Sequence, residues 1–409
     1  MAINLELPKK LQAVVQKGHQ GAAEMLRPIS RKYDLQEHAY PVELDTLADL
    51  FEGISEAKTI SFAGAEAFAE AGKNGDKAGK KANVNGGNMS AVLNVIEISW
   101  GDVALMLSVP RQGLGNAAIS SVATPEQLER LGKDVWAAMA ITEPGFGSDS
   151  AAVSTTATLD GDEYVINGEK IFVTAGSRAS HIVVWATLDK SKGRAAIKSF
   201  IVPRDHPGVT VERLEHKLGI KASDTATIRF DNVRIPKENL LGDPEIHVEK
   251  GFAGVMETFD NTRPIVAGMA VGIARAALEE LRKILTDAGV EISYDKPAHA
   301  QSAPAAEFLR MEADWEAGYL LTLRAAWQAD NGIPNSKEAS MSKAKAARVA
   351  SDITLKAVEL AGTVGYSEET LLEKWARDSK ILDIFEGTQQ IQLLVVARRL
   401  LGLSSAELK

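Results

Sequence analysis

The hydrophobic pattern of the chain changes near residue 138 and again near residue 245, and this change is what most constrains the fold. On both outer sides, apolar residues recur at helical spacing, as Val92, Val95 and Ile96 do. Between them lie short β-rich runs separated by turn residues, with no helices between the strands. Strands that follow one another in this way favour an antiparallel sheet or a small barrel. The sequence therefore predicts a mostly α, α+β fold, with a helical domain over 1–137, a β domain over 138–245 and a helical domain over 246–409.

Two turns are expected inside the β domain. Asp160-Gly161 is typical of a tight turn, and Asn167-Gly168 is the strongest short signal for a β-hairpin. The β-rich runs that we expect to form strands are 153–159, 164–166, 171–173, 182–185, 200–202 and 227–230.

The two helical regions carry apolar stripes at intervals of three and four residues. The stripes in the C-terminal region are Val266, Ala270, Ile273, Ala277 and Leu281, and then Ile353, Ala357 and Leu360, which end at Gly362. Nearer the N-terminus, Leu44, Leu47 and Phe51 share one face. The run from Gly72 to Asn88 is rich in Gly, Lys and Asn, and we expect a surface loop there.

Composition excludes several functions. A net charge of −9 argues against a nucleic-acid partner and against an anionic membrane surface. The chain has no cysteine, and its 7 histidines show no metal-ligand spacing, so we expect no metal site. The first residues lack the apolar core of a signal peptide, and no uninterrupted apolar run approaches membrane-spanning length. We therefore expect a cytoplasmic protein.

The stretch 384–392 places a carboxylate, Glu386, directly before Gly387 and between two apolar helical patterns. Glycine lets another molecule approach the backbone closely. A carboxylate in apolar surroundings can have a raised pKa, which suits a general base near neutral pH. Thr388, Gln389 and Gln390 then supply polar groups at an expected helix start. The alternative interpretation is a joint between helices that carries a solvated glutamate.

Three further segments carry polar or aromatic groups at positions that indicate contact with a ligand. Residues 142–149 read Thr-Glu-Pro-Gly-Phe-Gly-Ser-Asp, where two glycines would let the backbone approach a ring or a phosphate. Phe172 and Thr174, two residues apart, would share one face of a strand. Asp260 to Pro264 is typical of a helix start, and an Arg263 in the first turn would favour an anionic partner. Each segment alone is also compatible with an ordinary turn, strand or helix start.

Together, in this order and spacing, the four segments resemble the acyl-CoA dehydrogenase family, over about residues 10–402. The resemblance implies an N-terminal helical domain, a central antiparallel β-barrel-like domain and a C-terminal four-helix bundle. It implies FAD between the β domain and the bundle, an acyl-CoA substrate, an electron-transfer flavoprotein as acceptor, and a homodimer or homotetramer.

The resemblance also implies roles for individual residues. Glu386 would remove the α-proton, and its backbone N–H, with a flavin hydroxyl, would bind the thioester carbonyl, while the β-hydrogen leaves as hydride to flavin N5. Some branches of the family place the base on an earlier helix, but here that position is Thr262. The substrate contacts would be Ser148, Asp260, Arg263 and Glu386. The cofactor contacts would be Met139, Ile141, Thr142, Gly147, Ser148, Phe172, Val173, Thr174, Glu359, Thr363, Gly387, Thr388 and Gln390.

Two segments depart from the family pattern. The run from Asp287 to Asp295 lacks the arginine that usually reaches the FAD pyrophosphate of a neighbouring subunit. Glu359 and Thr363 stand where the family commonly has glutamine and glycine. Both changes would fall on the surface that completes a partner's FAD site, which leaves open a hetero-oligomer with a related subunit and weak activity alone. An oxidase-like branch is a further alternative.

Overall fold

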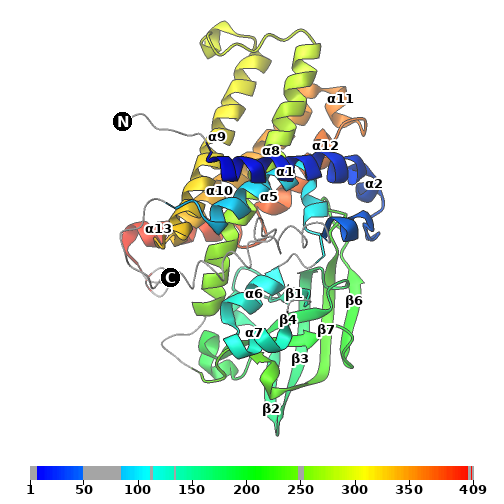
Figure 1. The fold of residues 1–409 in the computed structure, drawn as a ribbon, viewed down its shortest axis with the longest axis vertical. Coiled ribbons are helices and arrows are strands. Elements are labelled where there is room, and N and C mark those ends of the chain that lie inside the picture. Colours follow the sequence, from blue (N-terminus) through cyan, green and yellow to red (C-terminus); the bar gives the residue numbers. More distant parts are fainter. Residues whose placement is uncertain are drawn as a thin grey trace.

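The computed structural model describes residues 7–48, 84–110, 114–132, 135–246, 253–403 and 407, without the side chains of 114 and 253–261. Its elements form three groups along the chain (Figure 1). The sheet lies at one end with α6 and α7 beside it, the long helices α8 and α9 extend to the other end, and α1 and α2 cross between them. The predicted mostly α fold with a central sheet is confirmed.

The N-terminal group contains α1 (Lys9–Gly21), α2 (Ser30–Leu35), α5 (Gly87–Met106), α6 (Leu114–Val122) and α7 (Pro125–Leu131). Helix α5 has the length and mean hydropathy, 1.3, of a membrane span, but polar residues interrupt its sequence and 89% of that window is buried inside the protein. It is the core helix of this group, with Val92, Val95 and Ile96 all buried. Of the expected loop 72–88, residues 72–83 lie outside the described residues, as does Phe51, and Gly87 and Asn88 belong to α5 and not to a loop.

The β group forms a single eight-stranded sheet with the order β6-β7-β3-β2-β4-β5-β8, and β1 pairs with β4. The strands are β1 (Ala137–Ala140), β2 (Thr156–Asp160), β3 (Glu163–Thr174), β4 (His181–Thr187), β5 (Ile197–Pro203), β6 (Val209–Leu214), β7 (Thr225–Pro236) and β8 (Leu240–Leu241). Most neighbours are antiparallel, as expected, but β1 and β2 each pair with β4 in parallel.

The two predicted turns have different outcomes. Asp160-Gly161 does join β2 to β3, with Gly161 at φ +65°. The Asn167-Gly168 hairpin was wrong, because β3 runs through it without turning and shows a register shift against β7 there. A Cβ on Gly168 would lie 2.4 Å from Oγ1 of Thr155. Glycine is therefore needed here for a close approach at a β-bulge rather than for a turn.

The C-terminal group contains α8 (Ala253–Asp287), α9 (Ala303–Asp330), α10 (Ser336–Ala361), α11 (Thr363–Tyr366), α12 (Leu372–Leu382) and α13 (Gln389–Leu401). The stripe from Val266 to Leu281 is buried along α8, and the stripe on α10 ends at Gly362, as predicted. The predicted helix start at Asp260 to Pro264 was wrong, because these residues lie inside α8 and Pro264 is an interior residue. Proline is favoured at the first position of a helix, which explains the error.

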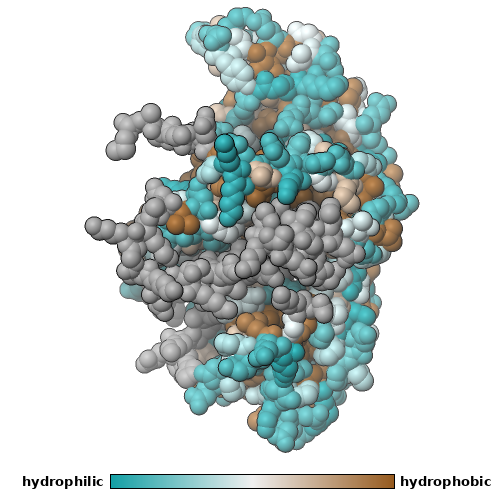
Figure 2. Space-filling view, in the orientation of Figure 1, coloured by the Kyte–Doolittle hydropathy of each residue, from teal (hydrophilic) through white to brown (hydrophobic). Residues whose placement is uncertain are grey.

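Buried ion pairs tie the three groups together near α12. Lys374, fully buried, lies 2.8 Å from Asp102 of α5 and also contacts Asp378. Asp378 accepts the backbone N–H of Ile220, in the loop between β6 and β7. These contacts fix the helix that leads into the loop containing Glu386. On the face shown in Figure 2, hydrophilic residues cover most of the described β domain, as expected when the apolar residues form a core.

Candidate active site in the loop between α12 and α13

The loop between α12 and α13 has an unfavourable backbone conformation, which side-chain hydrogen bonds hold in place. Glu386 and Gly387 both have left-handed φ values, +56° and +87°. A non-glycine residue in this region costs of the order of 1–2 kcal/mol. The side chain of Gln392, fully buried on α13, donates to the carbonyls of Glu386 (3.0 Å) and Gly387 (3.1 Å). Thr388 caps α13 through a bond from the N–H of Ile391, so the predicted helix start is confirmed.

The carboxylate of Glu386 points into the protein with one oxygen bound and one free. Its Oε2 accepts a hydrogen bond of 2.7 Å from the hydroxyl of Thr262 on α8. Among the residues that the structure describes, its Oε1 is buried without a hydrogen-bond partner. Burial raises the pKa of Glu386, and the Thr262 hydroxyl and the charges of Arg263 and Lys343 only partly oppose it. A carboxylate with a raised pKa and a free oxygen can accept a proton from a bound molecule.

Two cations lie close to this carboxylate. Arg263, 3% exposed on α8, contacts the hydroxyl of Ser340 at 3.4 Å. Lys343, fully buried on α10, donates to the carbonyl of Gly387 at 2.6 Å. Asp260 was expected to contact the substrate together with Arg263, but its side chain lies outside the described part of the structure.

The segment 142–149 forms a tight turn between β1 and β2. Glu143 and Phe146 exchange backbone hydrogen bonds of 3.2 and 3.0 Å around Pro144 and Gly145. A Cβ on Gly145 or Gly147 would meet nothing within 4 Å, so the outer side of this turn is open. The backbone of this turn is therefore uncovered on its outer side, and its contact with a ligand stays a prediction.

A buried ion pair fixes the base of this turn. Lys170 of β3, fully buried, donates to the carbonyl of Ile141 (3.1 Å) and to Glu143 (2.8 Å). The Glu143 carboxylate also accepts the N–H and hydroxyl groups of Ser154 and Thr155. The N–H of Ile171 donates to the carbonyl of Thr142 at 2.9 Å. The turn and the end of β3 are therefore side by side.

The end of β3 presents an aromatic ring to the surface. Phe172 is 60% exposed, Val173 is buried and Thr174 is half-buried, and the expectation that Phe172 and Thr174 share one face stays a prediction. The strand is irregular there, because Phe172 has φ +59° and the register against β7 shifts between Lys170 and Val173. With its side chain in the core, Val173 can meet a ligand only through its backbone.

The other expected contacts differ in exposure. Gly147, Ser148 and Gln390 are exposed, Met139, Thr142, Gly387 and Thr388 are half-buried, and Ile141 is buried. Glu359, in the last turn of α10, and Thr363, the first residue of α11, are exposed, and Glu359 pairs with Lys356 at 2.6 Å. Sixteen residues of α10 separate Glu359 from Lys343, which is roughly 24 Å at 1.5 Å per residue. These two residues therefore do not join Glu386 within one chain.

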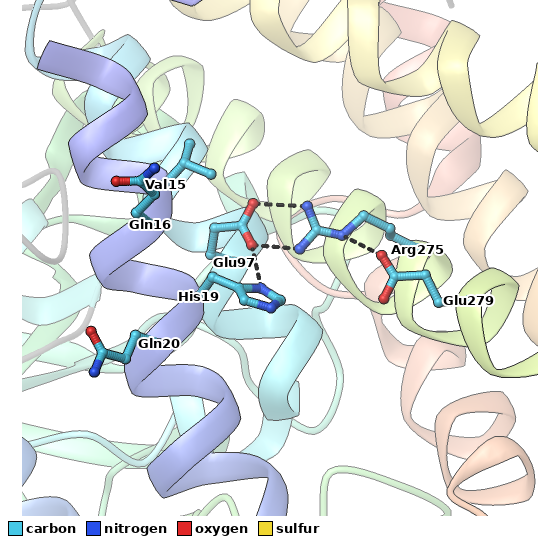
Figure 3. Close-up of a pocket in the computed structure, with 7 residues that line it drawn as sticks. All are labelled: Val15, Gln16, His19, Gln20, Glu97, Arg275 and Glu279. Atoms are coloured by element: carbon cyan, nitrogen blue, oxygen red, sulfur yellow. Dashed lines mark hydrogen bonds and ion pairs between the residues drawn. The ribbon is translucent and has the colours of Figure 1, made fainter. Parts of the chain in front are cut away.

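Two other clusters lie away from this loop. A cavity of about 420 Å³ is lined by Val15, Gln16, His19, Gln20, Glu97, Arg275 and Glu279 (Figure 3). Its central carboxylate, Glu97, is already bound by Arg275 and by His19 at 3.0 Å, so the charged groups of this cavity pair with one another.

The second cluster is Glu37, His38 and His216, which place three possible metal-ligand atoms within 4.8 Å of one another. Sequence spacing could not reveal this grouping. Lys217 and Arg178 adjoin that cluster, and a positive surrounding disfavours a cation.

Sequence reasoning missed Lys343, Gln392 and the pair Glu143–Lys170. A signal for Lys343 was present, because the buried stripe of Ile353 and Ala357 on α10 extends back through Ala346 and Ala350 to this lysine. A lysine on an apolar face is rarely fully buried without a specific partner.

Comparison with known proteins agrees with this architecture. Residues 138–233 match the family model of the acyl-CoA dehydrogenase middle domain, and residues 249–401 match that of the C-terminal domain. The chain is 34% identical over 405 residues to the mitochondrial short-chain specific acyl-CoA dehydrogenase of Bos taurus, covering 97% of this chain and 92% of that protein. It is 33% identical over 386 residues to subunit CarC of the caffeyl-CoA reductase–Etf complex of Acetobacterium woodii, covering 92% of this chain and 98% of that one.

Among solved structures, butyryl-CoA dehydrogenase from Megasphaera elsdenii has a TM-score of 0.79 and 29% identity, covering 98% of this chain and 100% of that one. The three-part fold and these matches define a flavoprotein oxidoreductase that acts on a CH–CH bond. The chain belongs to the acyl-CoA dehydrogenase family.

Proposed function

We propose that this protein is an FAD-dependent acyl-CoA dehydrogenase that converts an acyl-CoA thioester to its trans-2-enoyl-CoA, with Glu386 as the base. The observation that carries the proposal is the free, buried Oε1 of a carboxylate whose pKa burial raises. A general base works best with a pKa near the operating pH, and it needs an unoccupied lone pair. Thr262 stands at the position on α8 where some branches of the family place the base, and its hydroxyl donates to Glu386. Among the described side chains of α8, no carboxylate contacts Glu386.

The residues at the end of β3 fit a flat cofactor. The ring of Phe172 is exposed next to the open turn 142–149, and an exposed aromatic ring beside bare backbone suits a stacked heterocycle. In the proposal, Thr142, Ser148, Phe172 and Thr174 hold the isoalloxazine, with Met139, Ile141, Gly147, the Val173 backbone, Gly387, Thr388 and Gln390 as further contacts. When bound, FAD supplies the acceptor for the β-hydrogen and its two electrons.

The chain itself supplies the proton chemistry. Glu386 takes the α-proton on Oε1, while Thr262 holds Oε2 and so fixes the direction of the carboxylate. The electron pair of the broken C–H bond moves toward the thioester carbonyl, whose developing charge the backbone N–H of Glu386 would stabilise. Arg263 and Asp260 would face the CoA moiety, with Ser148 beside it.

The substrate and the acceptor follow from the relatives. We propose a short acyl chain, because relatives that match along their length are named for short-chain and butyryl-CoA substrates. We propose an electron-transfer flavoprotein as acceptor, because one full-length relative is a subunit of a reductase–Etf complex. A cytoplasmic location remains our proposal on the composition of the chain.

The outer end of α10 supports a role in an assembly. Because Glu359 and Thr363 are exposed and roughly 24 Å along α10 from the Glu386 loop, we propose that they contact the flavin of a neighbouring subunit. That neighbour is a second copy of this chain or, in our alternative, a related partner that supplies most of the activity.

The test is flavin reduction without oxygen. Butyryl-CoA should bleach the visible absorbance of the purified flavoprotein, and Glu386→Gln should keep its flavin but bleach about 10²- to 10⁴-fold more slowly. Bleaching at the wild-type rate by Glu386→Gln would exclude this residue as the base. A wild-type protein that holds no flavin would overturn the function as a whole.

A further inference from the structure

Lys343 holds an unusual position behind the Glu386 loop. It lies on α10 with no exposed surface, among the buried residues of the helix stripe, and its Nζ donates to the carbonyl of Gly387 at 2.6 Å. A buried ammonium normally has a carboxylate partner. Here the hydrogen-bond partner that the structure describes is a neutral backbone oxygen.

The charges around Lys343 come from two neighbouring elements. Asp383 and Glu386 face it from the loop between α12 and α13, and Arg263 faces it from α8. Asp383 is already paired with Arg348 (3.2 Å) and Lys380 (3.3 Å). Glu386 therefore remains the nearby anion whose charge Lys343 can balance. Burial lowers the pKa of Lys343 to about 8, with Asp383 and Glu386 opposing the shift, so the ammonium form predominates at pH 7.

The carbonyl that Lys343 binds belongs to the second of two successive left-handed residues. Such a backbone persists only where the surroundings fix it. Gln392 binds the same carbonyl from α13, while Lys343 binds it from α10, so the peptide is held from two sides. Loss of either donor frees the loop to relax and to move the carboxylate away from Thr262.

We propose that Lys343 is a positioning residue for Glu386, which it serves in two ways: it holds the Gly387 carbonyl in the conformation that directs the carboxylate, and its positive charge favours ionised Glu386. This inference rests on the proposed function of Glu386 as base. It assigns a role to a side chain that is fully buried behind the loop.

The charge contribution has a definite sign. A cation favours the ionised carboxylate and so lowers the Glu386 pKa against the opposing effect of burial. Removing the cation raises that pKa further. Because the base must be ionised to accept a proton, the acid limb of the pH–rate profile then moves to higher pH.

The experiment uses the holoenzyme and 3-thiabutyryl-CoA, in which sulfur replaces the β-carbon, so that α-proton removal is measured without oxidation. Deuterium uptake at the α-carbon in D₂O is followed by mass spectrometry across pH. Lys343→Met should slow exchange at pH 7 by about ten- to a hundredfold and move the acid limb up by roughly one pH unit. KM should change little, because Lys343 has no exposed surface with which to contact the CoA.

Matched variants separate charge from packing. Lys343→Arg should keep the acid limb near its wild-type position even where the rate falls, because it keeps the charge. Lys345→Met removes a half-exposed lysine of the same helix, paired with Asp314 at 2.6 Å, and should leave both rate and limb unchanged. If Lys343→Met does not fold, Lys343→Gln, which keeps a donor without the charge, should still move the limb.

The outcomes distinguish this inference from the proposed function. If Glu386→Gln abolishes exchange while Lys343→Met and Lys343→Gln retain the wild-type rate and acid limb, the role of Lys343 is wrong and the base stands. If Glu386→Gln exchanges normally, the proposed function itself fails. A slower Lys343→Met with an unmoved limb would remove the charge contribution and so contradict the inference as stated.

Discussion

Glu143 and Glu386 are both carboxylates beside a fully buried lysine, yet their environments push them in opposite directions. Glu143 accepts hydrogen bonds from Lys170 and from four N–H and hydroxyl groups of Ser154 and Thr155. Burial alone would raise its pKa, but these partners outweigh it and lower the pKa to about 2. Glu386 has one hydroxyl partner, and its lysine, Lys343, binds the carbonyl of the next residue and not the carboxylate. Burial therefore raises the pKa of Glu386.

The difference separates a structural carboxylate from a reactive one. Glu143 has its lone pairs occupied, so it fixes the turn that we propose to hold the flavin and can take up no proton at neutral pH. Glu386 has a free oxygen and an incompletely balanced charge, so it accepts a proton more readily than an ordinary glutamate does. The same residue type, buried beside the same cation, is inert or reactive according to the number of donors that reach it.

The largest expected effect is on the stability of the β domain. Lys170→Met leaves the Glu143 charge buried without its cation, and we expect the free energy of unfolding to fall by about 3–5 kcal/mol. Chemical denaturation measures this loss. Lys237→Met, which breaks a solvent-exposed pair with Asp162, is the matched control and should leave the free energy of unfolding nearly unchanged. A Lys170→Met protein as stable as the control would show that Glu143 does not depend on its lysine.

The same substitution should have opposite effects at the two carboxylates. Because the folded-state pKa of Glu386 is raised, its contribution to stability is present below the unfolded pKa and is lost as pH rises through the folded pKa. Glu386→Gln removes that loss, so at pH 8 it should be more stable than wild type. The gain should be roughly 1.4 kcal/mol for each pH unit by which the folded-state pKa exceeds the unfolded one.

Glu143 has a lowered pKa, so its contribution is present above the unfolded pKa and is lost as pH falls toward about 2. Glu143→Gln should therefore be less stable than wild type at pH 8. Denaturation of the two variants at pH 5 and pH 8 checks both signs, and a shared sign would end the comparison.

The smallest expected effect is at Thr262. Thr262→Val removes the hydrogen bond to Oε2 with little change of shape, so the pKa of Glu386 should rise by about one pH unit. The acid limb of turnover should then move to higher pH by the same amount, while the rate on its plateau stays within about tenfold. Thr322→Val of α9 is the matched control, because that buried hydroxyl bonds to the carbonyl of Gly318 in its own helix. An unmoved limb in Thr262→Val would show that the hydroxyl does not tune the base.

The order of helical and β regions could be predicted because hydrophobic periodicity is local. The continuous strand through Asn167-Gly168 could not be predicted, because a dipeptide typical of hairpin turns here forms a bulge where Thr155 approaches the backbone. The position of Glu386 between two helices was evident from its neighbours, but its bond to Thr262 joins residues 124 positions apart. The apolar stripe of α10 indicated that Lys343 is buried, but its partner Gly387 could not be predicted, because contacts of this range depend on how helices pack.

The central claim is that Glu386 is the group that takes the α-proton, and deuterium exchange into 3-thiabutyryl-CoA tests it most directly. Wild type should incorporate deuterium at the α-carbon with an acid limb above the ordinary glutamate range, because burial raises the pKa of Glu386. Glu386→Gln, with flavin content unchanged, should lose about 10²- to 10⁴-fold of that rate. Exchange by Glu386→Gln at the wild-type rate, with the same pH profile, would contradict the account.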